Sequence, residues 1–284
     1  MKPVLIIGGT GTVGSQVLAQ LSAKSIPVRV LARNPAACRF APQIEVVQGD
    51  LTLPETLDSS LDNIDAAFLV WTAPPATVPQ TLRKITNRVK RVVFLSAPIK
   101  TPHPLFQQPN LLRNLAAQIE QEIETSRVQW TFLRPGMFAS NSLVWWASQI
   151  RAGNVVRWPY LSVPTAPIDP RDIAEIAVRA LCDSGHHRAE YVLTGPESLT
   201  HADQISTIAR VIGRPLRVEE LSPEEARTEL LPIMPLGAID MLVSAWAAAE
   251  GHPALVTSTF ADITGHLPRC FSDWVADHSS HFLA

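Results

Sequence analysis

A cluster of glycines separates the first apolar segment of the chain from a segment with helical periodicity. The apolar segment is Val4–Ile7, the glycines are Gly8, Gly11 and Gly14, and the helical periodicity runs over 13–24. A strand, a glycine turn and a helix in this order form the phosphate-binding turn of dinucleotide-binding proteins. The first glycine permits the turn, the second lets the backbone approach a pyrophosphate, and the third lets the helix pack closely on the strand.

These glycines fit two spacings. Gly9, Gly11 and Gly14 satisfy G-x-G-x-x-G, whereas Gly8, Gly11 and Gly14 satisfy the G-x-x-G-x-x-G of short-chain dehydrogenases. A glycine-rich turn that binds nothing is the competing interpretation, and the strand before and helix after the turn favour dinucleotide binding. Free N–H groups at the helix N-terminus would meet the phosphates. The expected cofactor contacts in this turn are Gly8, Thr10, Gly11, Thr12, Val13 and Gly14.

The second predicted strand ends at a cation. In NAD-binding proteins this strand normally ends in Asp or Glu, which accepts hydrogen bonds from the ribose hydroxyls. Here residues 27–32 lead to Arg33 and Asn34, and no acidic residue occurs between Ala23 and Gln43. A guanidinium pairs with a 2′-phosphate through two parallel hydrogen bonds. Although Arg33 could instead be a solvated loop cation, we expect NADP(H) as cofactor, with NADPH preferred over NADH.

Strands and helices alternate through the first half of the chain. Because the strands are nearly continuous apolar runs, this pattern predicts an α/β fold with a doubly wound, parallel sheet of the Rossmann type. The predicted strands are 4–7, 27–35, 44–50, 66–71, 89–96 and 129–134, and the predicted helices are 13–24, 54–61, 78–88 and 110–125.

The pattern changes beyond residue 135. We expect residues 1–136 to form an NADP-binding domain and residues 137–284 to form a smaller α+β lobe on the substrate side, the whole being a single compact unit. The predicted helices of this part are 137–150, 171–181, 201–212, 222–231, 238–249 and 270–281, with a strand at 191–193.

Several motifs together resemble the NmrA-like group of atypical short-chain dehydrogenase/reductases, over essentially the whole chain. These motifs are the glycine turn, Arg33, Gly49-Asp50-Leu51, the string Leu133-Arg134-Pro135-Gly136-Met137-Phe138, and Asp169-x-x-Asp172-Ile173-Ala174. The resemblance implies that Asp50 and Leu51 flank the adenine and that Thr72 and Ala73 run beside the cofactor. It also implies that Ser96 and the segment from Pro135 to Phe138 border the nicotinamide.

The residues of proton transfer are missing from their usual helix. Typical short-chain dehydrogenases carry Tyr-x-x-x-Lys there, with Tyr as proton donor, and the family spacing places Leu112 and Ala116 at these positions. Ser96 occupies the place of the catalytic serine, although a small residue that ends a strand explains it equally well. Iminium ions, quinones and enones depend less than simple ketones on an enzymic acid, so such conjugated acceptors fit this chain better.

An aromatic segment follows the last strand of the predicted sheet. Large rings bury much area and stack on flat or cationic ligands. The expected substrate contacts are Met137, Phe138, Asn141, Trp145 and Trp158. Because Trp145 and Trp146 are adjacent on a predicted helix, at least one of them is expected in the core.

Composition excludes several classes of partner. The formal net charge is −2 and no Lys/Arg run exceeds two residues, so no nucleic-acid surface is expected. No apolar run is long enough to span a membrane, and no metal-ligand spacing occurs. Three widely spaced cysteines favour a reducing compartment, hence a cytoplasmic protein. The expected partner is a small molecule, and the expected state a monomer or homodimer.

Three functions compete on this sequence. The first is an NADPH-dependent oxidoreductase acting on a small conjugated or aromatic acceptor. The second is a non-catalytic redox sensor, since the NmrA-like group includes regulators that bind dinucleotides, and the missing Tyr and Lys favour it. An epimerase or isomerase ranks last because no acid–base pair is evident.

Overall fold

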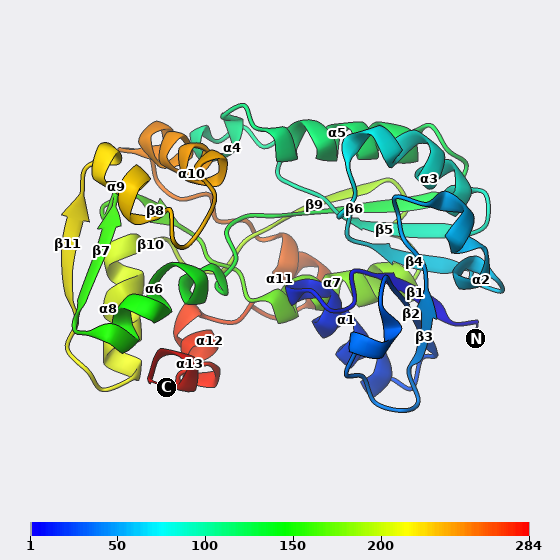
Figure 1. Ribbon diagram of the computed structural model, residues 1–284, viewed down its shortest axis with the longest axis horizontal. Coiled ribbons are helices and arrows are strands. Elements are labelled where there is room, and N and C mark those ends of the chain that lie inside the picture. Colours follow the sequence, from blue (N-terminus) through cyan, green and yellow to red (C-terminus); the bar gives the residue numbers. More distant parts are fainter. Residues whose placement is uncertain (1, 284) are drawn as a thin grey trace. The chain divides into compact units, whose positions relative to one another are not determined.

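The computed structural model describes residues 2–283 (Figure 1). Two compact units make up the chain, and both are discontinuous in sequence. Unit 1 comprises the residues up to Ala97, Leu111–Pro135 and Pro170–Val192. Unit 2 comprises Pro98–Asn110, Gly136–Asp169 and the residues from Leu193 onward. The predicted division into 1–136 and 137–284 stays a prediction.

A seven-stranded sheet forms the centre of unit 1, in the order β3-β2-β1-β4-β5-β6-β9. Pairing is parallel from β3 to β6, which confirms the predicted doubly wound α/β fold. The strand order reverses between β1 and β4, where ligands of such sheets bind at the carboxyl ends of the strands. The strands are β1 Val4–Ile7, β2 Val28–Ala32, β3 Glu45–Gln48, β4 Ala66–Leu69, β5 Arg91–Leu95, β6 Gln129–Pro135 and β9 Ala189–Leu193.

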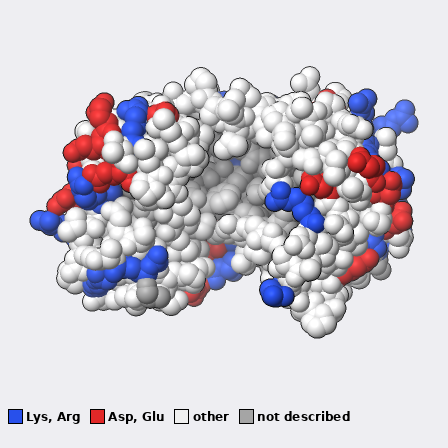
Figure 2. Space-filling view, in the orientation of Figure 1, with Lys and Arg blue, Asp and Glu red and all other residues white. Residues whose placement is uncertain are grey.

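Helices cover both faces of this sheet. Helices α1 and α7 pack together on one face, and α3 and α5 pack together on the other (Figure 1). Unit 1 contains α1 Thr12–Ala23, η1 Pro35–Ala37, η2 Pro54–Leu57, α2 Asp58–Leu61, η3 Pro75–Thr77, α3 Val78–Thr86, α5 Leu111–Glu124 and α7 Pro170–Cys182. On the face drawn in Figure 2, acidic and basic side chains are interspersed over α2 and α3.

Unit 2 is a mixed α+β assembly. Its two small sheets pair β7 with β11 in parallel and β8 with β10 in antiparallel orientation. The strands are β7 Val155–Pro159, β8 Pro164–Thr165, β10 Leu199–Thr200 and β11 Arg217–Leu221. The helices are α4 Pro104–Gln107, α6 Asn141–Ala152, α8 His201–Val211, α9 Pro223–Glu229, α10 Leu236–Ala249, α11 Thr259–Thr264, α12 Phe271–Asp277 and α13 Ser280–Leu283.

Local capping explains where two of these helices begin. Thr200 and Asp203 form a capping box at α8, and Ser222 and Glu225 form one at α9. Each side chain accepts a backbone N–H that the first turn leaves free. Ser222 is thus the N-cap of α9, and Pro223 lies in its first turn, where the missing N–H leaves no hydrogen bond unmade.

The predicted helix over 137–150 begins too early. Residues 137–139 lie outside the helix because they pair with another segment: Ile168 N–H donates to the Met137 carbonyl and Ala139 N–H donates to the Ile168 carbonyl, both at 2.8 Å. Helix α6 therefore starts only at Asn141. Elsewhere, the predicted helix over 270–281 is divided into α12 and α13.

Candidate cofactor site

The glycine turn after β1 has no room for side chains at Gly8 and Gly14. A β-carbon on Gly8 would lie 2.7 Å from the Val70 Cβ, and Gly8 has a positive φ of 89°, which side chains disfavour. A β-carbon on Gly14 would lie 2.1 Å from the Gly8 carbonyl oxygen. Gly14 therefore allows α1 to pack against the turn.

Gly11 differs from these two glycines because its side-chain position is tight but not blocked, so a shift of a few tenths of an ångström would admit a β-carbon. An added β-carbon would meet only the Gly8 carbonyl oxygen, at 3.3 Å. Gly11 is the N-cap of α1 in an extended conformation, and no side chain caps the helix. The first N–H groups of α1 therefore have no side-chain acceptor. An anion that binds at a helix N-terminus needs such free N–H groups as hydrogen-bond donors.

Next to this turn, the ends of β1, β2, β3 and β4 border an open cavity of about 330 Å³. Eight of the predicted cofactor contacts line it, namely Gly8, Thr10, Arg33, Asn34, Asp50, Leu51, Thr72 and Ala73. The structure thus brings together residues that are far apart in the sequence. Sequence reasoning missed the other lining residues: Ile7, Leu31, Ala32, Ala37, Cys38, Gly49 and Thr52.

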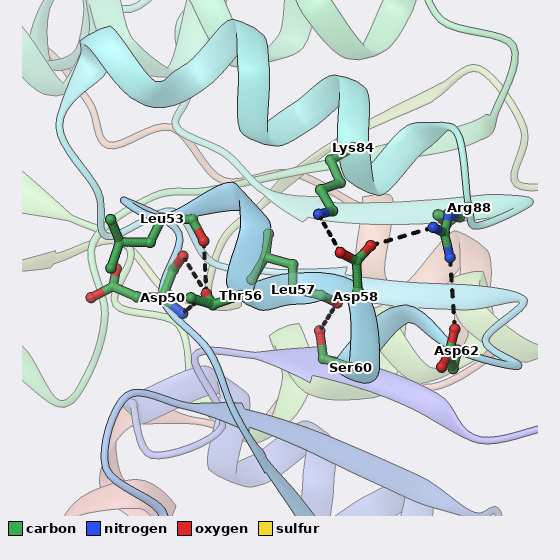
Figure 3. Close-up of polar contacts among 9 residues, drawn as sticks. All are labelled: Asp50, Leu53, Thr56, Leu57, Asp58, Ser60, Asp62, Lys84 and Arg88. Carbon is green, nitrogen blue, oxygen red and sulfur yellow. Dashed lines mark hydrogen bonds and ion pairs between the residues drawn. The ribbon is translucent and has the colours of Figure 1, made fainter.

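A hydrogen-bonded loop fixes Asp50 at the wall of this cavity. Its Oδ1 accepts the Thr52 N–H at 2.8 Å and the Thr52 hydroxyl at 2.9 Å, while its own N–H donates to the Thr56 hydroxyl oxygen. Thr56 in turn donates to the Leu53 carbonyl (Figure 3). The backbone hydrogen bond from Thr52, together with the charge of Arg33, holds the pKa of Asp50 below its ordinary value. Asp50 is therefore a carboxylate that can only accept.

Ion pairs anchor the segment behind this loop. Asp58, at the start of α2, pairs with Lys84 at 2.8 Å and with Arg88 at 3.3 Å (Figure 3). These contacts join α2 to α3 and to the residues that follow it, on the side of unit 1 that carries the cavity. Arg33 itself is exposed and lines the cavity, where its guanidinium can reach a bound anion.

A chain of charged groups around a buried ion pair lies at the ends of β5 and β6. Arg134 donates from Nε to Oε1 of Glu120 at 2.9 Å and from Nη2 to Oε2 at 2.6 Å, and it also pairs with Glu190. The side chains of Arg134 and Glu120 are both 3% exposed. Burial disfavours the charged guanidinium, but the bonds to Glu120 and Glu190 outweigh this and raise the pKa of Arg134.

Ser96 is the fourth member of this chain. Its hydroxyl lies 2.6 Å from Oε1 of Glu120, and its N–H donates to the Leu133 carbonyl at 2.8 Å. The weak catalytic candidate is thus engaged by a carboxylate. Whether it takes part in a reaction stays a prediction.

No proton donor stands at the positions that the family pattern uses. Ala116 is buried in α5 and Leu112 is exposed. Of the two tyrosines, Tyr191 shares a hydrogen bond of 2.8 Å with His186, and burial raises its pKa. Tyr160 belongs to unit 2, and burial raises its pKa as well.

The predicted substrate contacts divide into two groups within unit 2. Met137, Phe138 and Asn141 are half-buried, with the Asn141 amide 3.9 Å from the Met137 sulfur. Trp145 and Trp158 are 5% and 0% exposed. Burial of these two rings favours a packing role over contact with a ligand.

An aromatic cluster explains the burial of Trp145 and Trp158. Their rings lie 5.3 Å apart, and the ring of His201 lies 5.0 Å from that of Trp246 in the same cluster. Nδ1 of His201 lies 2.9 Å from the Tyr160 carbonyl, an acceptor, so it carries the proton. Burial lowers the pKa of His201 to about 4, so the core contains a neutral imidazole. Trp146 is also fully buried, and the expectation that at least one of the adjacent tryptophans is core is confirmed.

The family of the chain follows from its similarity to known proteins. The family model described as NAD(P)H-binding matches residues 8–184. The chain belongs to the NAD(P)H-binding family. This assignment confirms at family level the resemblance to atypical reductases and the NAD(P)H-type cofactor.

Relatives within this family align over nearly their whole length. A (4-alkanoyl-5-oxo-2,5-dihydrofuran-3-yl)methyl phosphate reductase of Streptomyces griseus is 38% identical, over 98% of this chain and 99% of the relative. An NAD(P)H azoreductase of Xenophilus azovorans is 30% identical, over 99% of both chains. An NADPH-dependent quinone oxidoreductase of Escherichia coli shares the fold, with a TM-score of 0.81 at 23% identity, over 97% of this chain and 99% of the other.

The site has the features that a dinucleotide phosphate requires. The turn offers uncapped helix N–H groups, Gly11 places no side chain beside them, and a cation lines the adjoining cavity. Within residues 2–283, no group of three or more His, Cys, Asp or Glu side chains could hold a metal ion. None of the helices in that range combines the length and apolar character needed to cross a bilayer.

Proposed function

We propose that the protein is an NADPH-dependent reductase that transfers hydride to a small conjugated or aromatic acceptor of the iminium, quinone or enone type. One observation carries the proposal: the cavity lined by Arg33 adjoins a glycine turn that leaves the N-terminus of α1 uncapped. Relatives named as reductases, among them an azoreductase, support a reductive reaction.

Each part of the site receives a role in this proposal. Gly8, Gly11 and Gly14 admit the pyrophosphate to the N-terminus of α1, with Thr10, Thr12 and Val13 beside it. Arg33 and Asn34 bind the 2′-phosphate, Asp50 and Leu51 flank the adenine, and Thr72 and Ala73 border the dinucleotide. Ser96 and Pro135 lie toward the nicotinamide, which supplies the hydride when NADPH is bound.

The acceptor class follows from the missing proton donor. Reduction of a ketone delivers a hydride to carbon and needs a proton at the developing alkoxide. Leu112 and Ala116 cannot supply that proton, and the hydroxyl of Ser96 faces a carboxylate. Quinones, enones and iminium ions delocalise or neutralise the charge, so a proton from water suffices. Met137, Phe138 and Asn141 are proposed to contact the acceptor.

A panel of acceptors tests the proposal. NADPH oxidation should be seen with at least one quinone, iminium ion or enone and should not be seen with matched saturated ketones, as measured at 340 nm and by product analysis. Reduction of the saturated ketones at comparable rates would contradict the assigned acceptor class. Failure to bind NADPH would remove the proposal altogether.

A redox sensor is the second candidate, favoured by the absence of a proton donor at positions 112 and 116. It predicts tight NADPH binding without turnover of any acceptor in the panel, together with a protein partner recovered by pull-down. The three cysteines are free thiols in the structure. This state suits a reducing compartment, so we propose a cytoplasmic location for either function.

Arg33→Ala should remove most of the preference for NADPH over NADH. Loss of a charge-assisted pair costs about 1.5–3 kcal/mol, so the ratio of the two dissociation constants should change by about 10- to 150-fold. Fluorescence titration with both cofactors measures it. Arg39→Ala is the matched control, because Arg39 is also exposed but does not line the cavity. Equal affinity of the unmutated protein for both cofactors would contradict the NADP assignment.

A further inference from the structure

The direction of one hydrogen bond can be determined from the chain of contacts that joins Ser96, Glu120, Arg134 and Glu190, in which Glu120 and Arg134 are buried. Both oxygens of Glu120 accept N–H groups of Arg134, whose guanidinium stays protonated. Glu120 is therefore a carboxylate and has no proton to give. The distance of 2.6 Å between the Ser96 hydroxyl and Oε1 of Glu120 is in the range of a charge-assisted O–H···O⁻ bond. Ser96 donates its only proton to Glu120.

A serine hydroxyl has one donor and two acceptor positions. Because the donor is used on Glu120, the oxygen of the half-buried residue Ser96 can only accept from a ligand. A carbonyl oxygen of a ligand also has only lone pairs to offer, so the Ser96 oxygen would repel it. The partner of Ser96 must therefore carry an N–H or O–H group.

The position of Ser96 in the sheet identifies the donor. Ser96 directly follows β5, two strands beyond β1 and on the opposite side of the switch point from β2 and β3. A dinucleotide in such a sheet lies across the switch point. With its adenosine in the cavity at β2 and β3, as the proposed function has it, its nicotinamide half extends toward β4 and β5.

We propose that Ser96 accepts a hydrogen bond from the carboxamide amino group of the nicotinamide, and that Glu120 and Arg134 are positioning residues that hold Ser96 in the accepting state. The inference rests on the proposed function. It also explains the buried ion pair: such pairs contribute little net stability because both charges lose water. Here the pair determines which way the Ser96 proton points.

A cofactor analogue without the amino group tests the proposal by equilibrium binding. NADPH and reduced 3-acetylpyridine adenine dinucleotide phosphate differ in that the carboxamide is replaced by an acetyl group, which cannot donate. Ser96→Ala should weaken NADPH binding about fivefold, within the range of a single hydrogen bond. It should leave the affinity for the acetyl analogue unchanged.

Glu120→Gln gives a second, opposite expectation. A glutamine amide can donate to Ser96, which releases the serine proton toward the ligand. The acetyl analogue should then bind more tightly relative to NADPH than it does to the unmutated protein. Melting temperatures of the apo proteins show whether each variant is folded.

Thr131→Val is the matched control. Thr131 is buried on β6, and its hydroxyl donates to the His186 carbonyl at 2.7 Å, away from the carboxyl ends of the strands. This variant should lose stability without changing the ratio of the two affinities. The inference would be overturned if Ser96→Ala weakened the binding of both ligands equally or of neither. Neither result would affect NADPH binding or reductase activity of the unmutated protein. If the unmutated protein did not bind NADPH at all, the proposed function itself would be refuted.

Discussion

Gly11→Val should weaken NADPH binding by about two orders of magnitude or more, a loss of roughly 3 kcal/mol, while the apo protein melts near its normal temperature. The extended conformation of Gly11 accepts a β-branched residue, and an added β-carbon would meet only the Gly8 carbonyl, at 3.3 Å. The rest of the valine side chain would stand where a pyrophosphate must approach the helix N-terminus. Titration calorimetry and thermal unfolding measure the two effects.

Gly14→Ala is the matched variant with the opposite expectation. Its β-carbon would lie 2.1 Å from the Gly8 carbonyl oxygen, so α1 must move away from the turn. Overpacking of this kind costs about 1–3 kcal/mol, seen as a lower melting temperature without ligand. The phosphate-binding interpretation of the turn would be wrong if Gly11→Val bound NADPH as well as the parent protein does. It would also be wrong if the melting temperature of Gly11→Val without ligand fell as far as that expected for Gly14→Ala.

Local signals made this half of the molecule predictable from sequence. The strand Val4–Ile7, the glycine turn and the helix after it are contiguous, and their order alone determines where a phosphate can bind. Arg33 and Asp50 each follow a strand, and the carboxyl ends of parallel strands meet at one edge of the sheet. The cavity that they share is a consequence of this topology.

Long-range packing explains what sequence could not predict. The segment 137–139 pairs with Ile168, a partner about thirty positions away that no local periodicity reveals. Aromatic composition cannot tell a pocket from a core, and Trp158 is buried in a cluster that draws on β7, α6, α8 and α10. Glu120 and Arg134 lie on different elements, and their pairing depends on how α5 packs against β6.

Arg134→Met should cost about 3–5 kcal/mol of unfolding free energy, because it leaves the Glu120 carboxylate buried without its counter-ion. Both partners are 3% exposed, so water cannot replace the lost contacts. Arg157→Met is the matched control in unit 2. Arg157 also pairs with two carboxylates, those of Glu219 and Glu229, but its side chain is 41% exposed. Its loss should cost about 0–1 kcal/mol, and urea unfolding at neutral pH measures both.

A double variant separates the charge from the packing. Glu120→Met combined with Arg134→Met removes the buried carboxylate along with its partner and replaces both with apolar side chains. It should be more stable than Arg134→Met alone, since an unpaired buried charge costs more than a missing pair. If the two variants were equally unstable, the cost would come from lost packing rather than from charge. The double variant should also lose the discrimination of Ser96 between NADPH and the acetyl analogue, because the Ser96 hydroxyl can then turn its proton toward either ligand. Stability and positioning would thereby be separated at a single pair of residues.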